Sequence, residues 1–220
     1  MRTFRLLLTA AALSTALLAQ QAFSPAWFVR GELPSLPPAV VVGGGEVLVE
    51  AIINENGALI RPVLLRSTPP FSEMVLDAIR GWKFAPALSV RPDGTVGPVE
   101  SGILIAGVFR PPTLIGPTLG DPPRDLRNAS PNVPYPVSLI SPPYPPQALM
   151  GSVILFEVLL DEAGRIRNAR ALLSDPGFDG AARAALLQWK FRPGSFRGRP
   201  AASTAYILFG FSPPVVSSVR

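Results

Sequence analysis

The sequence has no cysteine, no histidine and only two lysines, Lys83 and Lys190, among its 20 basic residues. Without cysteine the chain can form no disulfide and no thiolate metal site, so its folded parts must be held by packing alone. Without histidine it lacks the imidazole base and the commonest metal ligand. We therefore expect a protein that is not an enzyme, with no catalytic residue, no cofactor and no bound metal.

Proline and glycine are abundant, with 27 and 19 residues in a chain of 220. This composition argues against one continuous compact domain and predicts two small domains joined by a linker. Charge is uneven, because residues 31–110 carry six basic and eight acidic side chains, whereas residues 143–220 carry nine and five. Either the second half favours anionic partners or its arginines form a solvated surface, and the mixing of arginines with acids favours the solvated surface. No stretch interleaves aromatic and basic residues as nucleic-acid binding would require.

The first 22 residues have the layout of an export signal, with two arginines ahead of an apolar run over residues 6–19. This run of 14 residues is shorter than the roughly 20 that a membrane-spanning helix needs. No charged residue lies between Arg5 and Arg30, so an uncleaved membrane anchor is the alternative to a cleaved signal. In both cases we expect the rest of the chain to be exported.

One segment of the sequence occurs twice in related form. A shift of 107 residues aligns residues 44–86 with residues 151–193 without a gap, and 14 of the 43 positions are identical. Both segments end in Trp-Lys-Phe-x-Pro, which contains the only two lysines. An internal repeat of this kind predicts one module present in two copies.

Each copy predicts the same order of elements. An alternating apolar stretch, residues 47–53 in the first copy, predicts a strand with one apolar face. Gly57 then occupies a tight turn that needs a positive φ, and Pro62 places the second strand at a sheet edge or a bulge, because proline cannot donate to the ladder. A helical apolar stripe runs from Phe71 to Trp82, and a third strand ends at Phe109.

The predicted fold class is therefore α+β, with two tandem modules, each a helix packed on a three-stranded antiparallel sheet. We place the modules at residues 36–110 and 143–212, joined by a proline- and glycine-rich linker at residues 111–142, and expect them to behave as separate beads. Lys83 and Lys190 are expected in the last helical turn, facing water. The expected module cores contain Phe71, Trp82, Phe84, Phe178, Trp189 and Phe191.

Several acidic residues stand out. Glu50 and Glu157 interrupt the first strands of the two copies, and each is either solvated or involved in docking a partner. The pairs Asp161–Glu162 and Asp175–Asp179 fall in turns and at a helix start, so we interpret them as turn and capping residues rather than as metal ligands.

Residues 144–194 resemble the carboxy-terminal domain of TonB-family energy transducers. The resemblance rests on the Tyr-Pro-x-x-Ala motif at residues 144–148, the strand that starts at Gly151, the turn at Gly164, and the final Trp-x-Phe-x-Pro motif. The first copy resembles the family over residues 44–86, although it has only Leu-Pro-Pro-Ala-Val where the Tyr-Pro motif belongs.

The resemblance implies a periplasmic protein without enzymatic activity. Family members pair with a short segment of an outer-membrane transporter and pass on energy from an inner-membrane motor complex. The physical basis would be strand addition, because a three-stranded sheet has open edges that a peptide can complete. On this hypothesis the third strands are the docking edges, and the candidate partner-binding residues are Ile103, Ile105, Tyr206, Ile207, Leu208 and Phe209.

The chain departs from the family at the motor, because family members engage it through a histidine in their membrane helix and this chain has no histidine. The alternative hypothesis is accordingly a structural or self-associating periplasmic module, such as a homodimer, that is not coupled to transport.

Overall fold

The computed structural model describes residues 23–35, 43–111, 118–120 and 129–213. The expected signal or anchor at residues 1–22 lies outside these residues. Within the described stretches, no helix is long and apolar enough to cross a membrane.

The described part of the first half begins with two short strands that precede the repeated segment. Its elements are β1 (Phe23–Ser24), β2 (Trp27–Arg30), β3 (Gly45–Ile53), β4 (Leu59–Arg66), α2 (Phe71–Arg80), β5 (Lys83–Ala85), β6 (Ala87–Val90), β7 (Val96–Val99) and β8 (Ser101–Arg110).

The elements of the second half are β9 (Thr118–Gly120), β10 (Tyr135–Ser141), β11 (Ser152–Leu160), β12 (Ile166–Leu173), α3 (Asp179–Leu186), β13 (Lys190–Arg192), β14 (Ser195–Phe196), β15 (Arg199–Pro200) and β16 (Ser203–Phe211). From β10 onward the second half repeats the order of the first half from β2 onward, whereas β1 pairs with β6 and β9 pairs with β10, so these two short strands do not correspond. The sheet-rich α+β class expected from the sequence is confirmed.

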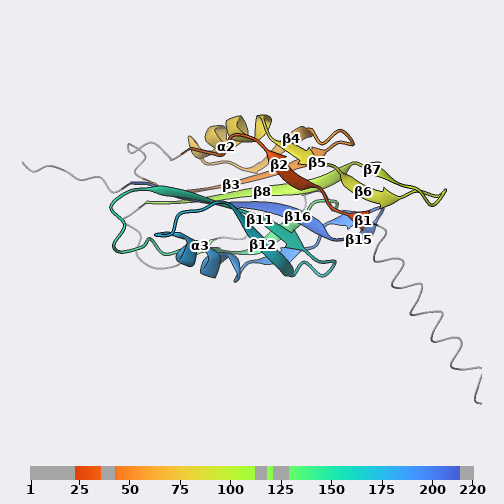
Figure 1. Cartoon of the computed structure of the whole chain (residues 1–220). Helices are drawn as coiled ribbons and strands as arrows, with labels where there is room; N and C mark the ends of the chain where they lie inside the picture. The colour runs from red at the N-terminus through yellow and green to blue at the C-terminus, as the bar shows by residue number, and fades with distance from the viewer. Residues whose placement is uncertain (1–22, 36–42, 112–117, 121–128, 214–220) are drawn as a thin grey trace, which may run out of the picture.

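The two halves share one continuous sheet of six strands in the order β12-β11-β16-β8-β3-β4 (Figure 1). Within each half the strands are antiparallel, with β3 between β4 and β8 and with β11 between β12 and β16. The halves join through β8 and β16, which are parallel from Thr204 opposite Ile103 to Phe211 opposite Arg110. The expectation that the two modules are separate domains is therefore wrong.

The composition of β8 and β16 explains this join. Both strands are nearly continuous apolar runs without alternation, a pattern typical of strands buried on both faces. Every residue of β16 is buried. In an isolated three-stranded module these strands would lie at an edge and leave apolar surface in water, which costs roughly 25 cal/mol per Å². Gly210 allows the close fit, because a Cβ there would lie 2.5 Å from the ring of Phe109.

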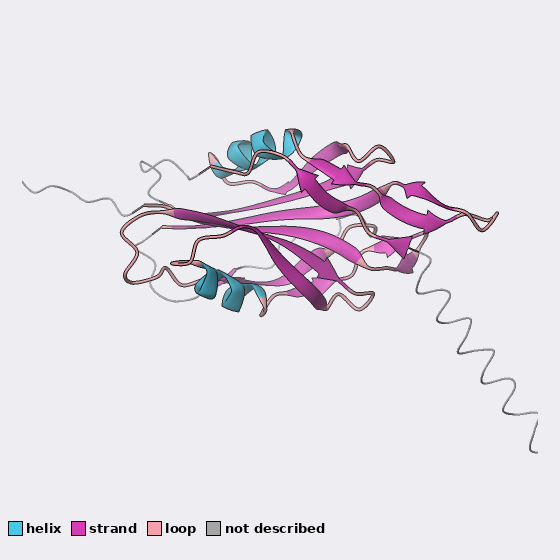
Figure 2. Cartoon of the chain, viewed as in Figure 1, coloured by secondary structure: helices cyan, strands magenta, loops and turns pink. Residues whose placement is uncertain are grey.

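The two helices lie on opposite faces of the shared sheet (Figure 2). Parallel pairing of two equivalent strands turns one half over relative to the other, which puts the two helices on opposite faces. Equivalent residues of β3 and β11, which are 107 positions apart, face the helix of their own half. Val47 and Val49 belong to the core under α2, whereas Ile154 and Phe156 belong to the core under α3. Each core also takes side chains from the other half, such as Tyr206 under α2. Neither half completes its core alone.

A further strand precedes each repeated segment. β2 pairs with β5, placing Phe28 opposite Phe84, and β10 pairs with β13, placing Pro136 opposite Phe191. The expected boundaries at residues 36 and 143 are corrected accordingly, because β2 belongs to the first half and β10, in the expected linker, belongs to the second. Lys83 and Lys190 also begin β5 and β13 rather than ending a helix, and both are exposed.

The tryptophans fasten these added strands. The indole N–H of Trp82 donates to the carbonyl oxygen of Glu32 over 2.8 Å, and that of Trp189 donates to Ile140 over the same distance. The six expected core aromatics are all buried, with exposed fractions between 1% and 6%. Trp-Lys-Phe thus links each helix to the strand that precedes its module.

The turn residues behave as the sequence indicates. Gly57 and Gly164 have φ values of 73° and 74°. A Cβ at Gly57 would lie 1.8 Å from the carbonyl oxygen of Phe84, so no other residue fits there. β4 lies at the sheet edge and is bulged beside Pro62, as its missing N–H requires.

Candidate functional site

The third strands are not docking edges. β8 pairs with β3 and β16, and β16 pairs with β8 and β11, so the ladders of both strands are occupied on both sides. No partner strand can add to them without separating the two halves. The correction covers all six candidate residues, each 0% or 1% exposed: Ile103, Ile105, Tyr206, Ile207, Leu208 and Phe209.

The open edges of the six-stranded sheet are β4 and β12. Among the described residues, β4 pairs only with β3 and β12 only with β11. In Figure 1 they lie on opposite sides of the central strands, β4 beside α2 and β12 beside α3. An edge strand offers unpaired N–H and C=O groups to an extended peptide. The candidate site therefore moves from the third strand of each half to the second.

The two edges differ at most aligned positions, and three consecutive positions in the middle affect the backbone. β4 has Arg61, Pro62 and Val63 where β12 has Asn168, Ala169 and Arg170. Arg61 has a φ of 50°, which lies in the left-handed region, and Pro62 has no N–H to offer. In β12 the four residues from Asn168 to Ala171 pair in unbroken register with β11. The register of β12 shifts at both ends of this stretch, but within it β12 is regular where β4 is interrupted.

The two faces of β12 also differ. On the α3 side, Ile166, Ala169 and Ala171 are half-buried against the core. On the other side Asn168 and Arg170 are exposed, and beyond them Leu172 and Leu173 are half-buried against the core under α2. The polar part of this face therefore ends at Arg170.

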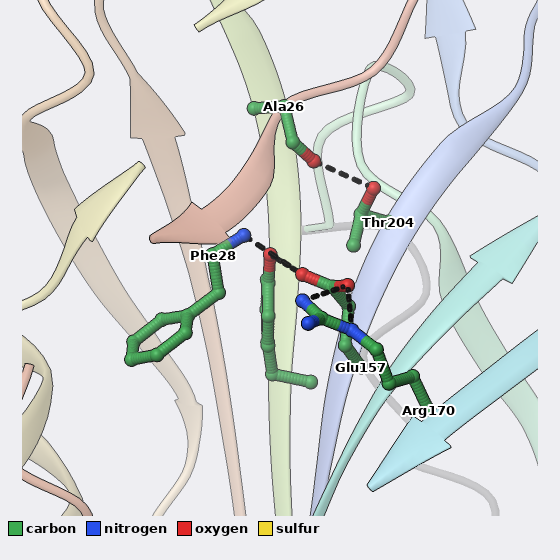
Figure 3. Close-up of polar contacts among 6 residues, drawn as sticks. Ala26, Phe28, Glu157, Arg170 and Thr204 are labelled. Atoms are coloured by element: carbon green, nitrogen blue, oxygen red, sulfur yellow. Dashed lines mark hydrogen bonds and ion pairs between the residues drawn. The ribbon is translucent and has the colours of Figure 1, made fainter. Parts of the chain in front are cut away.

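Glu157 lies at the centre of a polar cluster beside β12 (Figure 3). It is opposite Arg170 on β12 and opposite Tyr206 on β16. Its Oε1 accepts from Nη2 of Arg170 over 2.8 Å, and its Oε2 accepts from the Tyr206 hydroxyl over 3.1 Å. The same Oε2 accepts from the backbone N–H of Phe28 over 2.7 Å. Burial, together with the Glu157 charge, raises the pKa of Tyr206 well above its usual value, so this phenol is a hydrogen-bond donor at neutral pH.

The cluster joins the two halves, because Phe28 belongs to β2 and Glu157 to β11. Beside it the Thr204 hydroxyl donates to the carbonyl oxygen of Ala26 over 2.8 Å (Figure 3). Glu50 makes the reciprocal contact, as its Oε2 accepts from the backbone N–H of Ser130 over 2.9 Å. Each glutamate thus holds the segment that leads into the opposite half. The sequence signal for this role was an acid at the same repeat position of two largely apolar strands.

The remaining acids stabilise turns. The Asp161 Oδ1 accepts from the backbone N–H groups of Ala163 and Arg165, both over 2.9 Å, and Oδ2 contacts the guanidinium groups of Arg165 and Arg167. Burial raises the pKa of Asp161, but the hydrogen bonds and charge of Arg165 and the Ala163 N–H outweigh burial, and the pKa lies below its usual value.

The second acidic pair stabilises the turn before α3, and the expected capping role is wrong, because the N-terminus of α3 has no side-chain capping hydrogen bond. Asp179, the first residue of α3, accepts from the backbone N–H of Asp175 over 3.0 Å. Among the described residues, no three His, Cys, Asp or Glu side chains are grouped so that they could hold a metal ion.

Comparison with known families bears on the second half. Residues 141–213 match the family of the Gram-negative bacterial TonB protein C-terminal. This TonB-type stretch starts at the last residue of β10 and includes β11, β12, α3 and β16. A search of curated proteins gave no match. The TonB-type stretch thus contains the regular open edge, the Glu157 carboxylate and its Arg170 and Tyr206 partners.

Proposed function

We propose that this chain is an exported, TonB-like protein of the cell envelope that binds an extended segment of a partner by adding a strand to an outer edge of its sheet. The observation that carries the proposal is the pairing of β8 with β16 in a chain whose second half is TonB-type. This pairing leaves β4 and β12 as the open edges of the six-stranded sheet among the described residues. The protein acts by binding and catalyses no reaction.

We infer that residues 23–110 are a second, diverged copy of the same module. The 107-residue register of the sequence supports this inference, as does the shared order of elements in the two halves. The equivalent hydrogen bonds of Trp82 and Trp189 add support, because both fasten the strand that precedes a module.

The partner we propose is a periplasmic segment of an outer-membrane transporter, with possible coupling to an inner-membrane motor complex and with an export signal or anchor at residues 1–22. The TonB-type second half supports the transporter and the periplasmic location. The alternative, a structural module that self-associates, would also use β4 or β12, because the third strands already pair within one chain.

Titration of the ¹⁵N-labelled mature chain with peptides from the periplasmic ends of outer-membrane transporters tests this function. We expect amide shifts along β4 or β12 and none along the central strands. We also expect the unliganded chain to sediment as a monomer, which is the result that argues against self-association. The proposal fails if no amide on either edge shifts at millimolar peptide, or if a stable dimer covers both edges.

A further inference from the structure

We propose that β12 rather than β4 receives the partner strand, and that the partner is an extended segment in which acidic and apolar residues alternate. The inference rests on the strand addition proposed above and adds which edge is used and what chemistry is recognised.

The backbone favours β12. A partner strand needs regularly spaced N–H and C=O groups, and the four residues Asn168 to Ala171 lie in unbroken register between two register shifts. The Ala169 carbonyl accepts from Nη1 of the exposed Arg183 over 3.1 Å, and a partner strand that pairs with this carbonyl would displace that side chain. On β4 the aligned stretch contains Pro62, which has no N–H, and Arg61, whose positive φ turns the backbone out of the extended conformation. An added strand would meet a gap at the middle of β4.

The faces of β12 select an amphipathic partner. Side chains of an added strand alternate between the two faces of the sheet. Those on the α3 side would cover the exposed parts of Ile166, Ala169 and Ala171, which are half-buried beside the core. Those on the other side would lie beside Asn168 and Arg170. Apolar residues suit the first face and polar residues the second.

Charge selects acidic residues for the polar face. Arg165, Arg167 and Arg170 have side chains 71%, 61% and 51% exposed, whereas their partners Asp161 and Glu157 are only 5% and 12% exposed. The guanidinium groups, not the carboxylates, therefore face the solvent along this edge. Arg170 contacts Glu157 through Nε and Nη2, and a guanidinium has five N–H donors, so it can also bind a partner carboxylate.

A second copy of this chain is a poorer occupant of the edge. Pairing β12 with another β12 would bring arginines of two chains together, and like charges on neighbouring strands are destabilising. Arginine on an edge strand discourages this self-pairing while still accepting an acidic strand.

Two blocked nine-residue peptides test the inference on the full mature chain, one alternating valine and glutamate and the other alternating valine and lysine. We expect the glutamate peptide to shift amides along residues 166–173, and the lysine peptide to bind at least about tenfold more weakly. Arg170→Val, which installs the residue of the aligned β4 position, should weaken binding of the glutamate peptide about two- to fivefold. Arg61→Ala on β4 is the matched control and should leave binding unchanged.

Arg167→Ala is a second variant that keeps the Glu157 cluster intact, and its amide spectrum away from β12 reports whether the fold is preserved. It too should weaken the glutamate peptide. Equal binding of the two peptides would overturn the recognition of acidic residues. Shifts along residues 59–66 in place of 166–173 would overturn the choice of edge and leave the proposed function standing. If transporter peptides bind but the glutamate peptide shifts no amide on either edge, the inference about β12 and acidic partners is wrong and the proposed function stands. If no peptide of any kind binds, the proposed function is wrong as well.

Discussion

The two halves share a scaffold and differ where the sheet is open. Strands β3 and β11 are equivalent, as are the helices α2 and α3, but β4 carries Pro62 and Val63 where β12 carries Ala169 and Arg170. Each core contains side chains from both halves, so a substitution at a core position of one half alters the packing of both. Each outer edge pairs with only one neighbouring strand, so the two edges tolerate different residues. The comparison teaches that one framework carries two unlike edges.

The two glutamates show the same contrast in the interior. Glu157 accepts hydrogen bonds from Arg170, Tyr206 and the Phe28 backbone, whereas Glu50 accepts from the Ser130 backbone. Both hold the opposite half, but the second half supplies the denser network. We expect the junction to depend more on the second half than on the first.

The largest expected effect tests whether the halves are one folding unit. Trp82→Ala or Trp189→Ala should lower the free energy of unfolding by about 3 to 5 kcal/mol, since each removes a buried ring and the indole hydrogen bond. Because each core contains side chains from both halves, either variant should give one shifted transition on urea denaturation, followed by circular dichroism and by fluorescence.

Leu187→Ala is the control for this experiment. Leu187 follows α3 and is 61% exposed, so its removal should change the free energy of unfolding by no more than about 0.5 kcal/mol. Two separate unfolding transitions in a tryptophan variant would show that the halves unfold independently. That result would contradict the claim that they share one scaffold.

A smaller effect should separate the two glutamates. Glu157→Gln should cost about 1 to 3 kcal/mol, because the amide retains one acceptor oxygen and cannot serve Arg170, Tyr206 and Phe28 together. Glu50→Gln should cost less than about 1 kcal/mol, because one oxygen can still accept from Ser130. Urea titrations of both variants measure the difference, and equal losses would contradict the asymmetry of the junction.

The smallest effect concerns acid stability and the two tight turns. Asn54 in the first half and Asp161 in the second accept equivalent backbone hydrogen bonds, but only Asp161 titrates. Its pKa is lowered in the folded state, so its contribution is complete above the unfolded pKa of about 3.9 and is lost as the pH falls through the folded value.

Asp161→Asn should therefore flatten the fall in stability below about pH 4, with little change in the position of the turn. Thermal unfolding of both proteins between pH 2 and about pH 6 measures this slope. An unchanged acid limb would show that other carboxylates govern it.

Local structure could be predicted because each element depends on nearby residues. The alternating residues of β3, the glycine of each turn and the apolar stripe of each helix carry their signal within a short window. The position of Pro62 correctly placed β4 at an edge. By contrast β2 and β10 lie outside the aligned repeat, and their pairing with β5 and β13 depends on contacts about 50 residues apart.

The sequence by itself determined the repeated module and the residues that close each core, because periodicity, turn glycines and tryptophan spacing act locally. Only the tertiary structure decided which strand edges remain open. An apolar third strand such as β16 can bury its second face against a partner molecule or against its own copy, and the sequence pattern is the same for both. The chain buries it against β8, since a strand of the same chain is always close at hand and loses less entropy on pairing.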